Sequence, residues 1–573
     1  MPQETVRALL EEALRELGID DADIQLERPR DPSHGDVATN VAMTLASRLK
    51  RPPRAIAEEI AARIPVGDSG IEAVEVAGPG FLNFRMTTDA AGELLLDVLE
   101  SDERFGRSDT GGGAPVIIEF VSANPTGLLH VGHGRQAALG DAIASLFEWR
   151  GWAAHREFYY NDSGRQIDRL TASVRARYEQ VFGRDTPIPE GGYHGEAIAD
   201  LGRELARLDG DGWLDDGGES ARKRFRTFAV DRLRQEQDHD LTAFRVHFQE
   251  HFLESSLYEA GRVEATLSDL RKTGHVYEKD GAVWLRTTEF GDQKDRVMVK
   301  SDGSPTYFLP DVAYHITKWE RGFRRAVNVQ GADHHGTVAR VRAGLRALGL
   351  PEDYPEYVLH QMVRVERDGR EVKFSKRAGD YVTLRDLIEE VGVDVTRYFF
   401  LMRKPEAHLV FDLDEALDQS DRNPVYKVKY AHARLCSVLR RAGEDAETAK
   451  LGDAPVERLE HPAEHELIQQ LHEFPEIVER AGEQRAPHVI CDYLEKTAGQ
   501  VNSWYHAGNP TRNPELAVLV DDASLRSARL VLTRAARIVL RNGLHLLGLE
   551  APERMERSIE ESEDVPATEG AEG

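Results

Sequence analysis

Short apolar runs alternate with amphipathic stretches through the middle of the chain. A β-branched run at residues 116–122 is followed by a helical pattern over 134–150, where apolar residues recur at three- and four-residue steps. The same alternation of strand and helix returns later, at residues 326–330, 337–348, 357–365 and 383–391. Alternation of this kind predicts an α/β fold with a doubly wound parallel sheet, whose ligand binds at the carboxyl ends of the strands.

The amino-terminal region has a different pattern. Helical patterns near residues 5–17 and 40–50 and a short strand near 81–84 predict an α+β domain over residues 1–109. The glycine-rich stretch at 110–115 is predicted to be the linker that follows this domain.

The remaining boundaries follow from changes in composition. The alternating segment extends over residues 110–417, and its mostly charged helical part at 171–285 is predicted to be an insertion. Residues 418–557 are almost wholly helical in pattern and predict a helix bundle. One apolar stripe in it consists of Leu525, Ala528, Leu532, Ala535 and Val539. Residues 558–573 are acidic, and we expect them to be a disordered tail.

Composition and charge limit the class of protein. The 573 residues are enough for roughly three to four domains. A formal net charge of −27 argues against a nonspecific nucleic-acid binder, although a local basic groove remains open. No secretory signal pattern begins the chain, and no apolar run approaches the roughly 20 residues of a membrane helix. With Cys436 and Cys491 as the only cysteines, we expect a cytoplasmic protein without a disulfide framework or cysteine-based zinc site.

The most specific chemical motif is a pair of histidines. His130 and His133 enclose Gly132, directly after the predicted strand and loop and directly before the predicted helix. Histidines at a helix N-terminus can donate hydrogen bonds to a triphosphate, and the backbone N–H groups and the helix dipole favour the same anion. The alternative is that both are ordinary surface or capping histidines, because so short a match is frequent by chance.

A basic loop follows the last predicted parallel strand. It contains Lys373, Ser375 and Lys376, and two lysines three positions apart can neutralise charge that builds on the β- and γ-phosphates when the α-phosphate is attacked. Taken alone, such a loop is usually a solvated surface. Its position on the other half of the sheet that carries His130 and His133 favours the catalytic interpretation.

These two motifs resemble the HIGH and KMSKS signatures of class I aminoacyl-tRNA synthetases, and further segments are similar to the arginyl-tRNA synthetase family. The similar segments extend over nearly the whole chain, at residues 33–40, 78–83, 119–140, 159–166, 331–336, 423–426 and 430–436. Phe374 stands where the signature has Met, a change that keeps an apolar contact. The resemblance implies a Rossmann-like catalytic domain, an amino-terminal additional tRNA-binding domain and an anticodon-binding helix bundle.

The resemblance also implies an activity. It is the ATP-dependent conversion of L-arginine to arginyl adenylate and transfer of arginine to the 3′-terminal ribose of tRNA(Arg), with release of AMP and pyrophosphate. The implied partners are L-arginine, tRNA(Arg), and ATP with Mg²⁺ as substrate. The resemblance also implies a monomer that does not bind a membrane and has no protein-bound metal or organic cofactor. A metal site at Asp333, His334 and His335 is disfavoured, because adjacent histidines point apart and no third ligand at helix spacing is evident.

Two other classes of function are weighed against this one. A small-molecule adenylyltransferase also uses H-x-G-H, but such chains are far shorter and would leave the flanking regions unexplained. A non-catalytic tRNA binder should have damaged signatures, whereas His130, His133, Lys373 and Lys376 are all present.

The resemblance assigns roles around ATP. His130 and His133 would hold the phosphates, Lys373 and Lys376 would stabilise the transition state, and Ser375 would assist their loop. ATP-binding positions would also include Gly132, Gln361 and Met362. Because the arginine carboxylate is already a nucleophile, no general base is required, and catalysis would come from positioning and charge stabilisation.

The substrate guanidinium requires carboxylates in a planar, bidentate arrangement. Family positions that bind arginine match Glu119, Asn124, Tyr307 and Asp311. Tyr307 and Asp311 are four residues apart, share one face of a helical turn, and are assigned to the guanidinium. Glu119 and Asn124, at the first strand's end, are assigned to the α-amino and carboxylate groups. The alternative for Glu119 is a structural carboxylate paired with an arginine.

Aromatic residues in the flanking domains are candidates for contacts with tRNA bases. They are Phe81, with Asn83 beside it, in the amino-terminal domain, and Tyr426, Tyr430, Arg434 and Trp504 in the bundle. The alternative is that these side chains belong to the domain cores, since aromatic residues at helix spacing are more often core than base platforms.

Overall fold

The computed structural model describes residues 2–27, 29, 34–67, 70–86, 88–162, 164–372, 381–444, 454–509 and 511–555. The signature residues Lys373, Ser375 and Lys376 and the expected tail at 558–573 lie outside the described residues.

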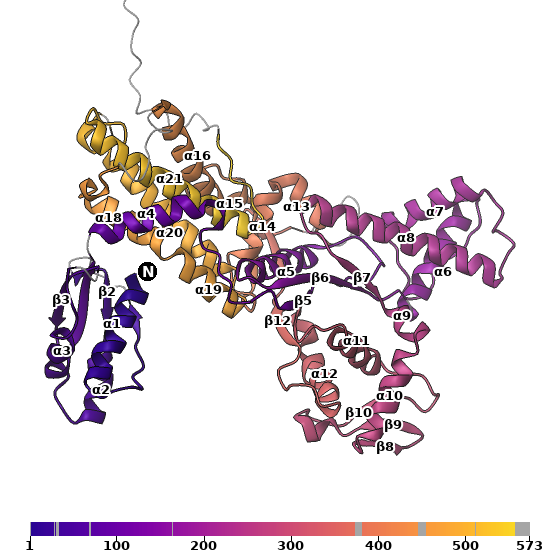
Figure 1. Ribbon diagram of the computed structural model, residues 1–573. Coiled ribbons are helices and arrows are strands. Elements are labelled where there is room, and N and C mark those ends of the chain that lie inside the picture. Colours follow the sequence, from indigo (N-terminus) through magenta and orange to yellow (C-terminus); the bar gives the residue numbers. More distant parts are fainter. Residues whose placement is uncertain are drawn as a thin grey trace, which may run out of the picture.

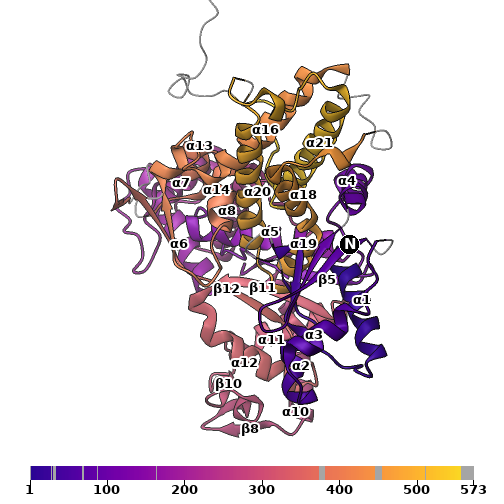
Figure 2. The same ribbon diagram turned by 90° about the vertical axis from the view of Figure 1, so that its left-hand side faces the viewer.

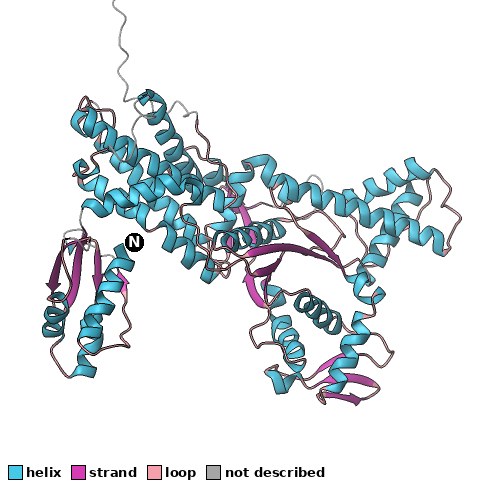
Figure 3. Ribbon diagram, in the orientation of Figure 1, coloured by secondary structure: helices cyan, strands magenta, loops and turns pink. Residues whose placement is uncertain are grey.

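A five-stranded parallel sheet occupies the centre of the molecule (Figures 1 and 3). Its strands lie in the order β12-β11-β5-β6-β7. Their bounds are β5 Pro115–Glu119, β6 Ala153–Tyr160, β7 Glu250–Leu253, β11 Arg325–Gly331 and β12 Glu356–His360. The β-branched residues Val116, Ile117 and Ile118 are wholly buried, as a central strand with both faces covered requires. The predicted parallel sheet is therefore confirmed.

Helices cover both faces of this sheet. Helix α5 (Val131–Trp149) packs with Val116 and Ile118 in one core. Helices α11 (Phe308–Glu320) and α12 (His335–Ala347) pack with Ile117 in another. Successive residues of β5 thus serve opposite layers, as the alternation of side chains along a strand demands. Glu119, two positions after Ile117, faces α11.

The run at 357–365 was expected to be one strand, and this expectation is wrong. The run divides into β12 and β13 (Val363–Arg367), which lie in different sheets. Strand β13 pairs with β14 (Arg370–Glu371) and β15 (Leu409–Asp412). The break falls at Gln361, whose N–H donates to the carbonyl of Pro405 at 2.9 Å and whose carbonyl accepts from buried Arg135 at 2.9 Å. These contacts outside the central sheet compete with continuation of the strand.

The stretch at 171–285 is more varied than the expected charged helix. Helices α6 (Arg165–Val181), α7 (Glu196–Asp209) and α8 (Glu219–Ala243) form an arm with its own hydrophobic core (Figure 1). Beyond the arm, β7 joins the edge of the central sheet. The chain continues through α9 (Glu254–Glu259), α10 (Arg262–Lys272) and the antiparallel strands β8 (Val276–Lys279), β9 (Ala282–Leu285) and β10 (Arg296–Val299).

The amino-terminal region forms a separate α+β unit. An antiparallel sheet contains β1 (Leu26–Glu27), β2 (Val37–Thr39), β4 (Phe81–Met86) and β3 (Ile71–Ala77), in that order. Helices α1 (Pro2–Glu16), α2 (Val41–Leu49) and α3 (Pro53–Ala61) enclose its core. Helix α4 (Thr88–Ser101) leaves this unit and lies along α21 of the bundle in both views (Figures 1 and 2).

The carboxyl-terminal region is a helix bundle. Its helices are α16 (Pro424–Ala442), α18 (Pro462–His472), α19 (Phe474–Gln484), α20 (His488–Ala507) and α21 (Ala523–Leu546). Helices α13 (Leu384–Val391), α14 (Val393–Leu401) and α15 (Leu413–Leu417) connect it to the central sheet. The predicted stripe is confirmed on α21 for Ala528, Leu532, Ala535 and Val539, which are fully buried, whereas Leu525 at its start is half-buried. Within the part of the chain described, no helix has both the length and the apolar character to cross a membrane.

Candidate active site

The two predicted histidines form the N-terminal cap of α5. Nδ1 of His130 accepts from the N–H groups of Gly132 at 3.0 Å and of His133 at 3.3 Å. Nδ1 of His133 in turn accepts from the N–H of His130 at 3.3 Å, and the two rings stack with centroids 3.7 Å apart. Because Nδ1 is an acceptor in both rings, each neutral imidazole carries its proton on Nε2. The site therefore offers two Nε2–H donors.

Both imidazoles are neutral at physiological pH. Burial lowers the pKa of His130. Burial and the neighbouring His130 and His360 lower the pKa of His133 to about 3. The pair consequently supplies hydrogen bonds to an anion without supplying positive charge.

The backbone N–H groups at this helix end are engaged within the protein, which corrects one expectation. The N–H of Val131 donates to the carbonyl of Val382 at 3.2 Å, and those of Gly132 and His133 donate to His130. An anion here would receive imidazole donors and the helix dipole, but not these amides. A Cβ at Gly132 would lie 2.9 Å from the His130 ring, so glycine is needed for the cap itself.

The loop between β5 and α5 is held from several sides. Val121 and Ser122 both have left-handed backbone angles, with φ of 66° and 42°, an unfavourable conformation for a β-branched valine. The buried Gln237 of α8 donates to the carbonyls of Asn124 and Gly127 at 3.0 Å each. These contacts hold the loop in an arrangement that its own sequence would not favour.

The segment after the second signature packs against the first. Leu384 N–H donates to the carbonyl of Leu129 at 2.8 Å, and His130 forms an isolated antiparallel bridge with Thr383. Tyr381 donates its hydroxyl to the carbonyl of Leu128 at 3.3 Å. The chain therefore brings residues that closely follow Lys376 in sequence beside His130.

Carboxylates gather at the carboxyl end of β5 and around α11. Burial, Glu254 and Glu119 raise the pKa of Asp311 to about 7. Tyr159, on β6, donates to Glu254 at 2.9 Å, and its own pKa is raised by burial and by Glu254, Asp311 and Glu119. The structure thus places Glu119, Glu254 and Asp311 in one acidic cluster, with the polarity that a cationic substrate requires.

The other two predicted arginine-binding residues occupy different positions. Asn124 is half-buried and donates to Gln166 at 2.5 Å. Tyr307 is the residue before α11 and is 71% exposed, so it lies at the rim rather than inside the cluster. The sequence argument missed Glu254 and Tyr159 as members of the cluster.

Gln361 and Met362 lie at the break between β12 and β13. Gln361 is half-buried, and its carbonyl accepts from Arg135, while the Met362 side chain is 77% exposed. The adjacent His360 is buried, and burial lowers its pKa to about 4. Burial is the main cause, and His130 also contributes to lowering the pKa of His360, which places His360 close to the histidine pair. It was not selected from sequence, because it lies inside an apolar run.

One possible metal cluster exists among the described residues, and it does not support a bound ion. Its members are His155, Glu157 and Glu250. Arg321 already pairs with Glu157 at 2.6 Å and with Glu250 at 2.6 Å, so the guanidinium of the chain itself occupies the carboxylate oxygens that an ion would need. Asp333 and His334 are exposed and lie 3.7 Å apart at the start of α12.

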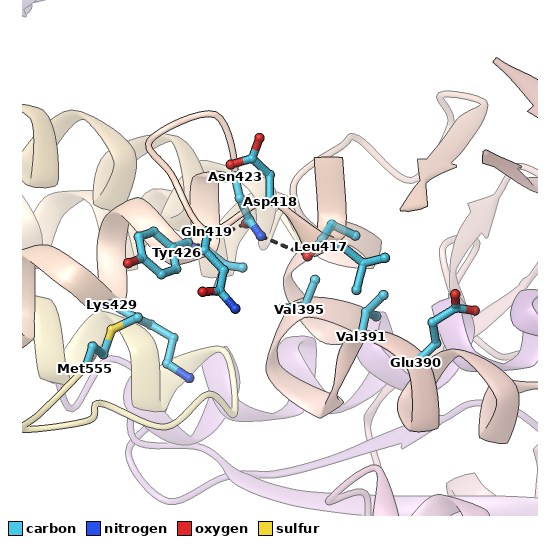
Figure 4. A pocket seen from close by; sticks show the side chains of 12 residues that line it. Glu390, Val391, Val395, Leu417, Asp418, Gln419, Asn423, Tyr426, Lys429 and Met555 are labelled. Atoms are coloured by element: carbon cyan, nitrogen blue, oxygen red, sulfur yellow. Dashed lines mark hydrogen bonds between the residues drawn. The ribbon is translucent and has the colours of Figure 1, made fainter. Parts of the chain in front are cut away.

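The bundle candidates for tRNA contact separate into two groups. Tyr426 and Tyr430 stack with centroids 5.8 Å apart, and Arg434 lies 4.8 Å above the Tyr430 ring. Tyr426 also lines a cavity of about 430 Å³ with Lys429 and Met555 (Figure 4). In contrast, Trp504 is 3% exposed and belongs to the bundle core.

The amino-terminal candidates separate in the same way. Phe81 is half-buried, whereas Asn83 is 6% exposed between β2 and β3. In this conformation the Asn83 side chain does not reach a partner at the surface.

Comparison with known families identifies the chain. Three family models match successive parts of it: "Arginyl tRNA synthetase N terminal domain" at residues 4–86, "tRNA synthetases class I (R), catalytic domain" at 95–432, and "DALR anticodon binding domain" at 428–555. The chain belongs to the arginyl-tRNA synthetase family.

Full-length relatives agree with this membership. An arginine–tRNA ligase of Thiobacillus denitrificans is 51% identical, over 96% of this chain and 98% of that protein. One of Herminiimonas arsenicoxydans is 50% identical, over 93% of this chain and 95% of that protein. The solved structure of Thermus thermophilus arginyl-tRNA synthetase superposes with a TM-score of 0.75 at 25% identity, over 97% of this chain and 100% of that one. The arginyl-tRNA synthetase resemblance seen in the motifs is confirmed.

Proposed function

We propose that this chain is an arginine–tRNA ligase. It activates L-arginine with ATP to arginyl adenylate and transfers the arginyl group to the 3′-terminal ribose of tRNA(Arg), releasing AMP and pyrophosphate. The observation that carries the proposal is the acidic cluster of Glu119, Glu254 and Asp311, which lies at the same sheet edge as the histidine pair in a chain of this family. A cation and a polyphosphate can thus be held side by side.

The acidic cluster is assigned to the substrate arginine. Asp311 and Glu254 would hold the guanidinium, since two carboxylates can accept its several N–H donors. Glu119 and Asn124 would hold the α-amino and carboxylate end, and the exposed Tyr307 would cover the site from the rim.

The histidine pair is assigned to ATP. His130 and His133 would donate from Nε2 to phosphate oxygens, and Gly132 would keep that end of α5 narrow enough for approach. Gln361 and Met362, with His360, would lie on the nucleoside side. Mg²⁺ would arrive with ATP as substrate and supply charge that the neutral histidines do not.

The second signature is assigned to the chemical step. Lys373 and Lys376 would stabilise the charge of the pentavalent transition state, and Ser375 would assist their loop. This assignment rests on the sequence and on the proximity of Tyr381 and Thr383 to the loop and helix start that carry His130. The carboxylate of arginine is the nucleophile, so no side chain has to remove a proton from it.

The flanking regions are assigned to tRNA. We divide the chain at residues 1–109, 110–417 and 418–557, with the first part and the bundle contacting tRNA(Arg). Phe81, Tyr426, Tyr430 and Arg434 present accessible rings or charge for this purpose. The protein would act in the cytoplasm as a monomer.

An aminoacylation assay tests the proposal. The purified chain is incubated with ATP, Mg²⁺ and homologous tRNA, and each of the standard amino acids is supplied separately. Charging with arginine alone is expected. Formation of a nucleotide product without charged tRNA would favour a small-molecule adenylyltransferase. Binding of tRNA without charging of any amino acid would favour a non-catalytic tRNA binder.

A further inference from the structure

One row of polar residues crosses the central sheet from edge to edge. In register, each strand contributes one residue. From β12 to β7 these are Tyr357, Asn328, Glu119, Glu157 and Glu250. The interiors of such parallel sheets are normally apolar, because helices cover both faces. Glu119 is 5% exposed and Glu157 is fully buried, so two acidic side chains lie on adjacent strands inside the protein.

Two cations at the carboxyl end of α11 contact the glutamates of this row. From α11, Lys318 contacts Glu119 at 2.6 Å and Asn328 at 3.1 Å. Three residues later, Arg321 contacts Glu157 and Glu250. Three- and four-residue steps place side chains on one face of a helix, so both cations face the sheet. Each of the two buried glutamates therefore has its own cation.

The pair of Lys318 and Glu119 is expensive as a structural device. Lys318 has no exposed surface, and its ammonium lies 4.3 Å from the centre of the Tyr314 ring. Removing both charges from water costs free energy that their attraction regains only in part. Replacing a buried ion pair by apolar residues therefore often leaves the stability of a protein unchanged or increases it. Stability alone therefore does not account for a charged pair at this position.

The position of the pair relates it to the substrate instead. Glu119 is the row residue that also belongs to the acidic cluster with Glu254 and Asp311. Its Oε2 accepts from Lys318, and its Oε1 accepts from Ser122 at 3.1 Å. The Ser122 oxygen in turn accepts from the N–H of Tyr159 at 3.2 Å, which fixes the hydroxyl. Each carboxylate oxygen keeps a further lone pair for a ligand.

We propose that Lys318 is a positioning residue for arginine, which holds and orients the Glu119 carboxylate so that its free lone pairs accept from the α-ammonium of the substrate. This inference rests on the proposed function and on the assignment of Glu119 to that end of arginine. Lys318 acts only through Glu119, because it lies behind the carboxylate with no exposed surface.

The groups that face Glu119 show why one lysine matters. Lys318 is the cation in contact with Glu119, while the other neighbours are acids, phenols and an amide. They are Asp311 and Tyr314 on α11, Glu157 and Tyr159 on β6, Glu254 on α9, Asn328 on β11, which contacts His315, and Tyr357 on β12. Without Lys318, the Glu119 carboxylate loses its contacting cation and the hydrogen bond that fixes Oε2. A carboxylate that is no longer fixed presents its lone pairs less well to an ammonium group.

The test compares Lys318→Met with the wild-type enzyme in aminoacylation between pH 6 and 9. The KM for arginine is expected to rise by about 10- to 100-fold at pH 7, the effect of losing one charged hydrogen bond. The KM for ATP should stay unchanged, and kcat should change less than the KM for arginine. Lys318→Arg, which keeps the charge, should restore most of the affinity.

Arg321→Met is the matched control. It removes the cation of the same helix that serves Glu157 and Glu250, so it is expected to lower stability without changing the KM for arginine. A change in arginine KM as large as that of Lys318→Met would contradict the proposal, because it would reflect general damage to α11.

A double-mutant cycle separates positioning from structural support. If Lys318 acts through Glu119, then Lys318→Met in a Glu119→Gln background should raise the arginine KM no further. Additive effects, or an unchanged arginine KM in soluble Lys318→Met, would overturn the inference. Should Lys318→Met fail to fold, Lys318→Gln gives the same measurements with a polar side chain. Absence of arginine charging by the wild-type enzyme would instead refute the proposed function.

Discussion

The bundle and the catalytic sheet each contain a buried ion pair, but the surroundings of the two pairs differ in charge and hydrogen bonding. In the bundle, Arg529 donates to Glu464 at 2.7 Å and to the carbonyls of Glu515 and Ala517. The other oxygen of Glu464 accepts from the N–H of His461 at the start of α18. Both members of this pair are thus hydrogen-bonded to other groups of the bundle, and the pair joins α18 to α21.

The catalytic sheet has an excess of acid. Lys318 balances Glu119, but Glu254 and Asp311 lie in the same cluster, and burial with these neighbours raises the pKa of Asp311. Three carboxylates gathered in one cluster are an unfavourable feature of the free enzyme and a favourable one once a cationic ligand binds. The bundle pair therefore serves architecture, whereas the cluster is prepared for a ligand.

Breaking the bundle pair should have the largest effect. Arg529→Met leaves Glu464 buried without its cation, and we expect the free energy of unfolding to fall by about 3–5 kcal/mol. Denaturant unfolding followed by circular dichroism measures this. The double variant Arg529→Met with Glu464→Gln should recover much of the loss, and the KM for arginine should remain near wild type in both. A large rise in arginine KM without loss of stability would reverse the contrast between the two regions.

Removing charge from the cluster should act on the substrate instead. Asp311→Asn is expected to raise the KM for arginine by about 100-fold, as for a lost partner of a charged group. The KM for ATP should stay near its original value, because the histidine pair is unaffected. Steady-state aminoacylation gives both constants, and Asn124→Ala, at the other end of the substrate, is the comparison. Unchanged arginine kinetics in Asp311→Asn would show that the guanidinium binds elsewhere.

The same carboxylate predicts a pH dependence. With a pKa of about 7 in the free enzyme, Asp311 must lose a proton before it holds a guanidinium. The arginine KM should therefore rise by roughly tenfold for each pH unit below 7 and be flat above it. Asp311→Asn should lose this dependence. A wild-type KM that is constant from pH 6 to 8 would contradict the raised pKa.

The stability of the free enzyme should change with pH in the opposite direction to arginine binding. The pKa of Asp311 in the folded protein lies above its usual value of 3.8, so the folded state binds more protons between these values. The free enzyme thus loses stability as the pH rises from about 4 through 7, and it regains stability on binding arginine. The melting temperature of Asp311→Asn minus that of the wild type should be larger at pH 8 than at pH 5. Thermal unfolding without arginine measures this difference.

The sequence predicted those parts of the fold that bury continuous apolar surface. Residues 116–118 and the stripe on α21 were recognisable because their periodicity matches the layers they face. Strand β7 was missed because its residues are only partly buried and polar at two of four positions. The break after β12 was missed because Arg135, more than 200 residues away, fixes the carbonyl of Gln361.

The residues of the candidate site also divide into those that a local sequence pattern shows and those that only long-range contacts bring together. His130 and His133 were selected because the H-x-G-H motif is local, and Tyr307 and Asp311 because they match family positions and lie four residues apart. Glu254 could not be found in this way, since it enters the cluster only because β7 pairs with β6. Strand register likewise aligns Glu119 with Glu157, and no local pattern shows that Lys318 serves the first of them.

An exposed pair in the bundle should give the smallest effect. Arg458 contacts Asp522 at 2.8 Å, with side chains 39% and 47% exposed, so water screens their attraction. Asp522 has a second role, because it accepts from the N–H groups of Ser524 and Leu525 and caps α21. Arg458→Ala is therefore expected to leave the free energy of unfolding almost unchanged. Asp522→Ala should destabilise the protein more than Arg458→Ala, because it also removes the cap. If Arg458→Ala destabilised the protein as much as Arg529→Met, burial would not distinguish the exposed pair from the buried pair in the bundle. The contrast between the bundle and the acidic cluster would then depend only on ligand binding.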